Sequence, residues 1–172
     1  MILTGNEIKK RVDSEEITIN PFIIDNLSTN SYDITLDNHI VKYKEKVIDP
    51  KKESNYEIIE IPEEGYVLQK GDFVLGSSKE VIGSDCYVPL IHAKSGIARL
   101  GLFVHVTADL IDIGYKGNIT FQLYSVNRLK IYKNMKIGQI TFWKCFGKIN
   151  LYDGKYQRGK GAQVSKTYED FN

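Results

Sequence analysis

The chain has 172 residues, the size of one domain that can bury a substantial core. Its 23 basic and 22 acidic residues give a formal charge of +1, which favours neither nucleic acid nor a membrane surface as a partner, so any anion site must be local. The first residues lack the apolar run of a signal peptide, and Cys86 and Cys145 lack disulfide or zinc-site spacing, so we expect a cytoplasmic protein with two reduced core thiols.

The N-terminus contains the one helix that the sequence predicts. Thr4 and Glu7 have the spacing of a capping box, and Ile8 and Val12 fall on one helical face. The sequence EEITINPF that follows predicts a short strand ending near Pro21. Residues 28–36 then alternate apolar and polar side chains, which is typical of a strand.

The rest of the chain predicts more strands and almost no helix. Residues 41–64 are highly charged and predict a solvated hairpin. From Tyr66 onward, short apolar runs alternate with turn signals, and Gly71, Gly76 and Gly83 are predicted to separate three of the strands. Further strands are predicted in LKIY, MKIGQITFWKCF and INLY. The pattern indicates one all-β domain over residues 1–172, a sandwich or barrel.

Residues 93–124 place polar side chains in a context otherwise typical of strands. Lys94, Ser95 and Gly96 offer a charge, a hydroxyl and accessible backbone N–H groups, which together suit a phosphate chain. The alternative is a solvated turn between two strands. The C-terminal tail, residues 150–172, combines glycines with basic and aromatic residues and predicts a mobile lid over an anionic ligand; its alternative is a frayed terminus.

Several common catalytic motifs are missing. The sequence has no GxxxxGK[ST] phosphate loop, no GxGxxG and no GxSxG elbow. It also lacks the HxE and PCxxC elements of zinc nucleobase deaminases, and its three scattered histidines predict no metal site.

Several separated segments together resemble the dCTP deaminase/dUTPase superfamily, specifically its dCTP deaminase-like branch. They are MILTGNEI with INPF, STNSYDITL, AKSGIARLGLFVHVTADLIDIGYKG, MKIGQITF and YDGKYQRGKG. The resemblance implies a β-clip fold, a distorted β-barrel or jelly roll, in a homotrimer with active sites between subunits. It also implies a dUTP- or dCTP-type nucleotide as substrate, with Mg²⁺ carried on the phosphates and no metal site of the protein's own.

The resemblance also assigns roles to residues. Asp112, Ser95, Arg99 and Gln122 fall at catalytic positions, with Asp112 holding the attacking water. Tyr115 falls where the deoxyribose stacks, and main-chain groups of Val106 and Ala108 fall where the base is bound. The other positions implied to bind substrate, chiefly its phosphates, are Lys94, Gly96, Gln139, Tyr152, Lys155, Arg158 and Lys160.

One departure from the family pattern decides the predicted reaction. Deaminases of this family carry a glutamate where this chain has Gln122, and an amide cannot take up and return a proton at neutral pH. The motif around Ser95 and the RGKG of the tail also resemble dUTPases more than deaminases. We therefore predict a dUTP diphosphatase that forms dUMP and pyrophosphate. The alternatives are a dCTP deaminase, with or without that hydrolysis, whose carboxylate is Asp109 or Asp112, and a nucleotide-binding relative without turnover.

Overall fold

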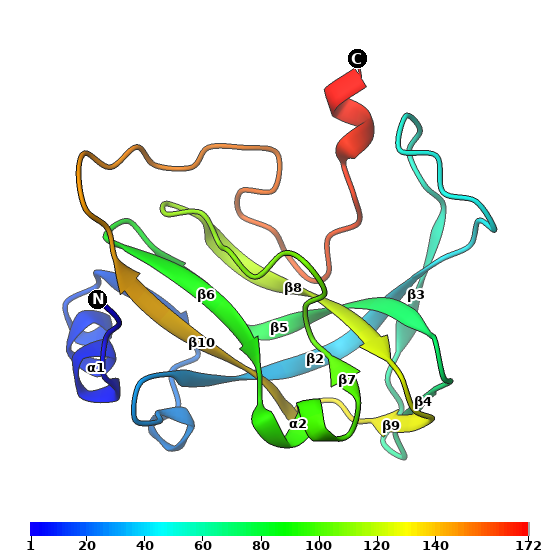
Figure 1. The fold of residues 1–172 in the computed structure, drawn as a ribbon, viewed down its shortest axis with the longest axis horizontal. Helices are drawn as coiled ribbons and strands as arrows, with labels where there is room; N and C mark the ends of the chain where they lie inside the picture. The colour runs from blue at the N-terminus through cyan, green and yellow to red at the C-terminus, as the bar shows by residue number, and fades with distance from the viewer. Residues whose placement is uncertain (172) are drawn as a thin grey trace.

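The computed structural model describes residues 1–171, and its regular secondary structure consists mainly of strands (Figure 1). Its α-helices are α1 (Gly5–Asp13) and α2 (Ser95–Arg99), and its 3-10 helices are η1 (Ile24–Asn26) and η2 (Thr167–Phe171). Its strands are β1 (Ile17–Asn20), β2 (Tyr32–Tyr43), β3 (Tyr56–Glu60), β4 (Tyr66–Leu68), β5 (Phe73–Ser84), β6 (Tyr87–Ala93), β7 (Leu102–Phe103), β8 (Lys116–Ser125), β9 (Leu129–Ile131) and β10 (Lys136–Lys144).

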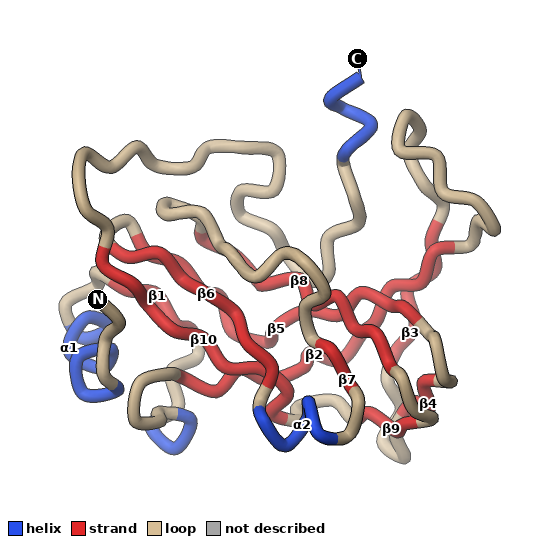
Figure 2. Tube along the Cα trace, viewed as in Figure 1, coloured by secondary structure: helices blue, strands red, loops and turns tan. Residues whose placement is uncertain are grey.

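Eight of the strands form one sheet that curls into a nearly closed barrel (Figure 2). The order is β6-β10-β2-β5-β8-β7, with β1 paired to β5 and β3 paired to β2, and all of these pairings are antiparallel. A separate two-stranded sheet joins β4 and β9. The structure confirms the predicted all-β, barrel-like fold with one short N-terminal helix.

The core lies inside this barrel and follows the period of two that strands impose. On β8, Ile119, Phe121 and Leu123 are buried, while the residues between them are half-buried on the other face. Ile34 and Leu36 of β2 are fully buried in the same core. Burying each such side chain stabilises the fold by about 1.5–3 kcal/mol, so the barrel holds β8 rigidly in position.

The predicted N-terminal helix is present, but its predicted cap is not. Thr4 makes no side-chain hydrogen bond to the helix, and Glu7 instead pairs with Arg11 one turn later at 2.6 Å. The capping box was therefore the wrong interpretation of this spacing, because the i,i+4 ion pair takes the glutamate away from the helix end.

Two glycines predicted as turns lie inside a strand. β5 continues through Gly76 and Gly83, with a register shift against β8 between Ser77 and Val81. A Cβ at Gly83 would lie 2.4 Å from the Tyr115 carbonyl oxygen, so glycine is needed there for close packing and not for a turn. The turn predicted at residues 94–96 is instead the start of a short helix, with Lys94 as the N-cap residue and Ser95 as the first helical residue, and residues 149–152 form no strand.

Other predicted elements differ in detail. β2 begins at Tyr32, later than predicted, and continues to Tyr43, where it pairs with β3 in the predicted hairpin. Cys86 and Cys145 are free thiols, as expected, but both are half-buried and neither is a core residue. Among residues 1–171, we find no helix with the length and apolar character needed to cross a membrane.

Candidate functional site

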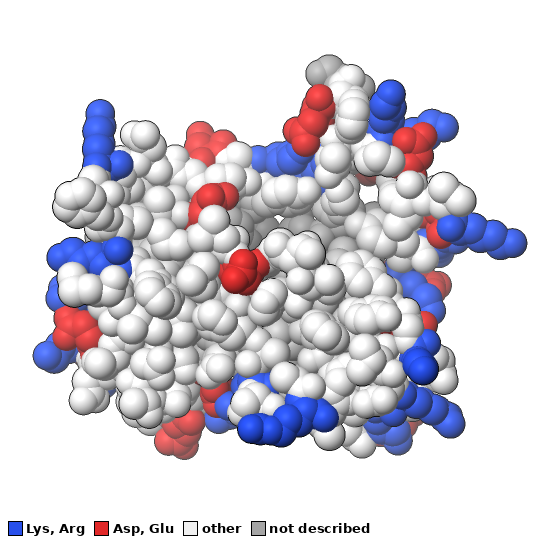
Figure 3. All heavy atoms as spheres, in the orientation of Figure 1, with Lys and Arg blue, Asp and Glu red and all other residues white. Residues whose placement is uncertain are grey.

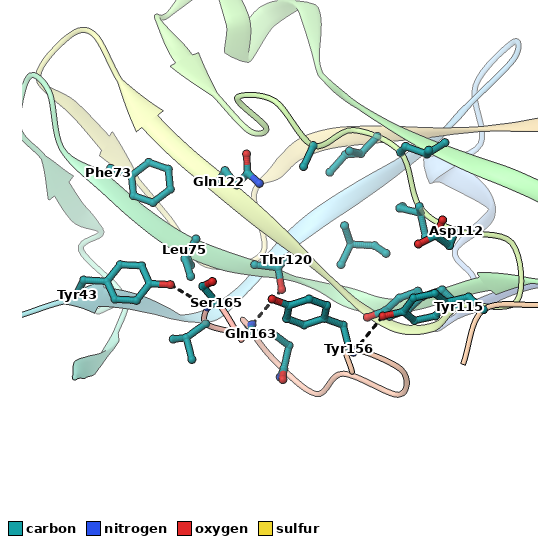
Figure 4. A pocket seen from close by; sticks show the side chains of 17 residues that line it. Tyr43, Phe73, Leu75, Asp112, Tyr115, Thr120, Gln122, Tyr156, Gln163 and Ser165 are labelled. Atoms are coloured by element: carbon teal, nitrogen blue, oxygen red, sulfur yellow. Dashed lines mark hydrogen bonds between the residues drawn. The ribbon is translucent and has the colours of Figure 1, made fainter. Parts of the chain in front are cut away.

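A cavity of about 490 Å³ lies between the polar face of β8, the 108–112 loop and the C-terminal tail. Figure 4 shows Gln122, Thr120, Tyr115 and Asp112 around it. The residues lining it are Tyr43, Phe73, Leu75, Ile91, Ala108, Leu110, Ile111, Asp112, Tyr115, Ile119, Thr120, Gln122, Tyr152, Tyr156, Gln163, Val164 and Ser165. This lining is mostly apolar or aromatic with a few polar groups, as is typical of a small-molecule site.

Gln122 reaches the cavity because of its place on β8. Its neighbours Phe121 and Leu123 point into the core, so Gln122 and Thr120 share the opposite face. The Val106 N–H donates to Gln122 Oε1 at 3.0 Å, and the Thr107 N–H approaches the same oxygen at 3.4 Å. The side chain therefore ties β8 to the loop that follows β7.

Asp112 and Tyr115 belong to the tight turn that leads into β8. The Tyr115 N–H donates to the Asp112 carbonyl at 3.1 Å, and Gly114 between them has a φ of 92°, which favours glycine. The Tyr115 hydroxyl donates to the Asn118 carbonyl at 2.7 Å, and its ring packs against Tyr152. Burial and this second ring raise the pKa of Tyr115 to about 12, so the phenol stays protonated near neutral pH.

The tail closes the cavity by running along β8. The Asn118 N–H donates to the Gly159 carbonyl, the Gly161 N–H donates to Asn118 Oδ1, and the Gln163 N–H donates to Thr120 Oγ1, at 2.9, 3.1 and 3.0 Å. The Ser165 N–H then donates to the Tyr43 hydroxyl at 2.9 Å. The tail thus covers the cavity within its own chain; its predicted mobility stays a prediction, and Asn172 lies outside the described residues.

The predicted phosphate-binding cations do not reach this cavity. Its lining contains one charged residue, Asp112, and no Lys or Arg among the described residues. Lys94 forms an ion pair with Asp33, and the Lys155 ammonium donates to Asp170 at 2.7 Å, which raises the pKa of that lysine. Arg158 and Lys160 line a second cavity beyond the tail, together with Lys116.

The other predicted positions are also separate from the cavity. Ser95, Gly96 and Arg99 are exposed on α2, which contributes nothing to the lining. Figure 3 shows basic side chains over α2 at the lower edge of this face, away from the tail at the top. Gln139 on β10 accepts a hydrogen bond from the Ser31 hydroxyl through Oε1 at 3.1 Å.

The structure thus brings together one part of the predicted site. Of the residues named from the sequence, Ala108, Asp112, Tyr115, Gln122 and Tyr152 line the cavity, and Val106 contacts it through Gln122. Tyr43, Phe73 and Thr120 also line the cavity, although no sequence motif indicated them. Thr120 could have been found from its period of two with Gln122, whereas Tyr43 and Phe73 come from distant strands and carry no local signal.

Comparison with known proteins identifies the family. A dCTP deaminase-like family model matches residues 2–145, and the chain belongs to this family of enzymes. A protein of Clostridium botulinum named "dCTP deaminase, dUMP-forming" is 42% identical over 172 residues, covering 99% of each chain. A protein of Cytophaga hutchinsonii with the same name is 41% identical, again covering 99% of each chain.

A solved structure shares the fold at much lower identity. The dCTP deaminase of Agrobacterium tumefaciens superposes with a TM-score of 0.64 over 87% of this chain and 50% of its own, at 17% identity. At that identity the likeness shows the fold alone.

These relatives correct the predicted reaction. The names of the full-length relatives describe a dCTP deaminase that forms dUMP, which is a different reaction from hydrolysis of dUTP alone. The prediction of a plain dUTP diphosphatase was therefore wrong, and the alternative of a dCTP deaminase is better supported. Gln122 and a few motif residues resemble dUTPases, whereas the similarity along the whole chain is to proteins named as dCTP deaminases.

Proposed function

We propose that this protein converts dCTP to dUMP. The observation that carries the proposal is similarity over the full length, tail included, to proteins named "dCTP deaminase, dUMP-forming". By atom balance, the conversion consumes two water molecules: one adds at C4 of cytosine and expels ammonia, and one attacks the α-phosphorus and expels pyrophosphate. The cavity supports both, since it combines apolar walls for a base with the Asp112 carboxylate.

The second step suits the residues around Asp112. Phosphoryl transfer depends mostly on positioning and on neutralising charge, and a carboxylate that orients water is a common part of such sites. Among residues 1–171, no three His, Cys, Asp or Glu side chains gather to hold a metal. We therefore propose that Mg²⁺ arrives on the triphosphate, where it would screen the phosphate charge.

The first step needs a proton carrier other than Gln122. An amide cannot exchange protons at neutral pH, and general acid–base catalysis is typically worth about 10²–10⁴-fold. We propose that a carboxylate of the 109–112 loop takes this role; Asp112 lines the cavity, and Asp109 lies between two residues that do. We expect deamination to be slow for this reason.

The lining has no Lys or Arg among the described residues, which supports an active site shared between two copies of the chain. A triphosphate requires positive charge, yet Arg99 on α2 and Lys94, which directly precedes α2, both lie outside the lining. We propose that a second copy of the chain brings its α2 to this cavity, within a homotrimer. Mixing Arg99→Ala with Asp112→Asn tests this: each variant alone should be nearly inactive, and co-refolded mixtures should recover activity. If the mixtures recover no activity, each active site is built from a single chain and the proposal of a shared site is wrong.

The reaction itself is tested with dCTP and dUTP. The full chain with Mg²⁺ is incubated with each nucleotide, while ammonia, pyrophosphate and dUMP are followed together. Equal amounts of ammonia, pyrophosphate and dUMP from dCTP are expected. Binding of dCTP without any product would refute the proposal and favour a non-catalytic relative; ammonia without pyrophosphate would limit it to deamination.

A further inference from the structure

The orientation of the Gln122 amide is fixed by the loop beside it. Oε1 accepts from the Val106 N–H at 3.0 Å and lies 3.4 Å from the Thr107 nitrogen. Turning the amide over would place its NH₂ group against two N–H donors, which is unfavourable. The amide oxygen is therefore used by the protein, and the NH₂ group is the end that remains for a ligand.

Most other polar groups of the cavity already have protein partners. Tyr115 donates to a carbonyl, Thr120 accepts from the tail, and Gln163 Nε2 donates to the Lys160 carbonyl at 2.7 Å. The hydroxyls of Tyr43, Tyr152, Tyr156 and Ser165 are also hydrogen-bonded. Within residues 1–171, the Gln122 NH₂, a donor, and the Asp112 carboxylate, an acceptor, make no hydrogen bond to the protein. The hydroxyls of Tyr43, Tyr152, Tyr156 and Thr120 accept from backbone N–H groups and keep their own protons to donate, whereas the Gln122 NH₂ is the donor beside the 106–107 loop.

We propose that Gln122 is a specificity-determining residue that selects a pyrimidine with an oxygen at position 4. This rests on the proposed function, in which C4 of the base reacts in this cavity. The walls near β5 are Phe73 and Leu75, which offer nothing polar beside Gln122. In this proposal the base packs against these two side chains and turns its C4 edge to the Gln122 NH₂. Uracil O4 accepts from that donor, whereas the 4-amino group of cytosine is itself a donor.

The consequence is that the site holds dUTP more tightly than dCTP. A mismatched donor pair leaves two polar groups unsatisfied, and we expect about a tenfold difference in Kd. The nucleotide formed by deamination would then stay bound for the hydrolysis that completes dUMP formation. Gln122 thus favours the second step of the sequence while slowing the first.

The experiment measures binding before turnover. The imido bridge blocks release of pyrophosphate but leaves the 4-amino group of the dCTP analogue open to deamination, so ammonia is followed and each Kd is taken from data collected before ammonia appears. Calorimetry with Mg²⁺ compares the α,β-imido analogues of dUTP and dCTP on the full chain; the dUTP analogue should bind about ten times more tightly. Gln122→Glu should reverse the preference, because one carboxylate oxygen would accept from the Val106 N–H and the other from the 4-amino group. Gln163→Glu makes the same chemical change in the same cavity and should leave the ratio unaltered.

A third analogue tests the proposal on the unaltered protein. The triphosphate of 2-pyrimidinone deoxyriboside, in the same imido form, lacks the oxygen at position 4 and should bind more weakly than the dUTP analogue. Equal binding of these two, equal or tighter binding of the dCTP analogue, or no binding of any analogue would overturn the proposal. Failure of the dCTP turnover assay with this ratio intact would instead refute the proposed reaction and leave the selectivity standing.

Discussion

Replacing Asn118 should loosen the tail at Gly161, because this one side chain connects β8 to both β5 and the tail. Its Nδ2 donates to the Ser78 carbonyl at 2.9 Å and lies 3.4 and 3.3 Å from the carbonyl oxygens of Lys79 and Glu80. These residues form the β5 bulge, the segment between Ser77 and Val81 where the register against β8 shifts. Its Oδ1 accepts from the Gly161 N–H at 3.1 Å. Asn118 therefore holds the β5 bulge with its amide nitrogen and the tail with its amide oxygen.

The magnitude follows from the bonds that Asn118→Ala removes. Each intramolecular hydrogen bond contributes about 0.5–1.5 kcal/mol, so losing the two shorter ones should cost about 1–3 kcal/mol of unfolding free energy. The loss at the tail should speed exchange of the Gly161 amide hydrogen about tenfold, while the Gln163 amide keeps its Thr120 partner.

The assay is hydrogen exchange of the tail together with urea unfolding. Asn118→Asp is an informative second variant, because it keeps the acceptor for Gly161 but places a carboxylate oxygen against the bulge carbonyls. Asn127→Ala is the control, since its amide donates to the Leu100 carbonyl at 3.0 Å and makes no hydrogen bond with the described part of the tail. Unchanged Gly161 exchange in Asn118→Ala would refute the role of Asn118 in holding the tail.

Three further variants test other parts of the structure. Asp112→Asn should reduce pyrophosphate release about 10²–10⁴-fold with nearly unchanged Kd for the dUTP analogue, and full turnover would remove Asp112 from the mechanism. Truncation after Asn150 should weaken binding of that analogue, because the tail covers the cavity; equal Kd values would contradict a lid. Burial raises the pKa of Glu80, so its carboxyl favours folding at low pH, and this contribution is lost as pH rises through the folded-state pKa. The neutral amide introduced by Glu80→Gln can still accept from the Thr35 N–H and donate to the Thr35 hydroxyl. This variant should therefore gain unfolding free energy over the wild type as pH rises above about 4.5, and an unchanged difference would contradict this.

The sequence predicted the barrel because strand periodicity is local and repeated. It could not place Gly76 and Gly83 inside β5, since the need for glycine there comes from side chains and backbone of other strands. Ser95 and Arg99 lie on the short helix α2, where the sequence predicted a turn, and no spacing in the sequence tells that α2 lies outside the cavity lined by Asp112. The path of the tail was equally hidden, because it depends on hydrogen bonds to Asn118 and Thr120 some forty residues earlier in the chain.

Gln122 shows that overall sequence identity and a single cavity residue report different properties of the protein. Identity of about 40% along the full length reports which cavity is built, because fold and lining depend on many side chains. The group that position 122 presents to the cavity is a single side-chain terminus, and it can change while the rest of the lining stays the same. The Val106 N–H holds the Gln122 amide, and the neighbouring Phe121 is fully buried, so the packing of the barrel determines the position of this amide. In Gln122→Glu the same backbone geometry would present a carboxylate to the base. Faster release of ammonia from dCTP by this variant would show that the amide limits deamination. An unchanged rate would show that another group in the site limits it.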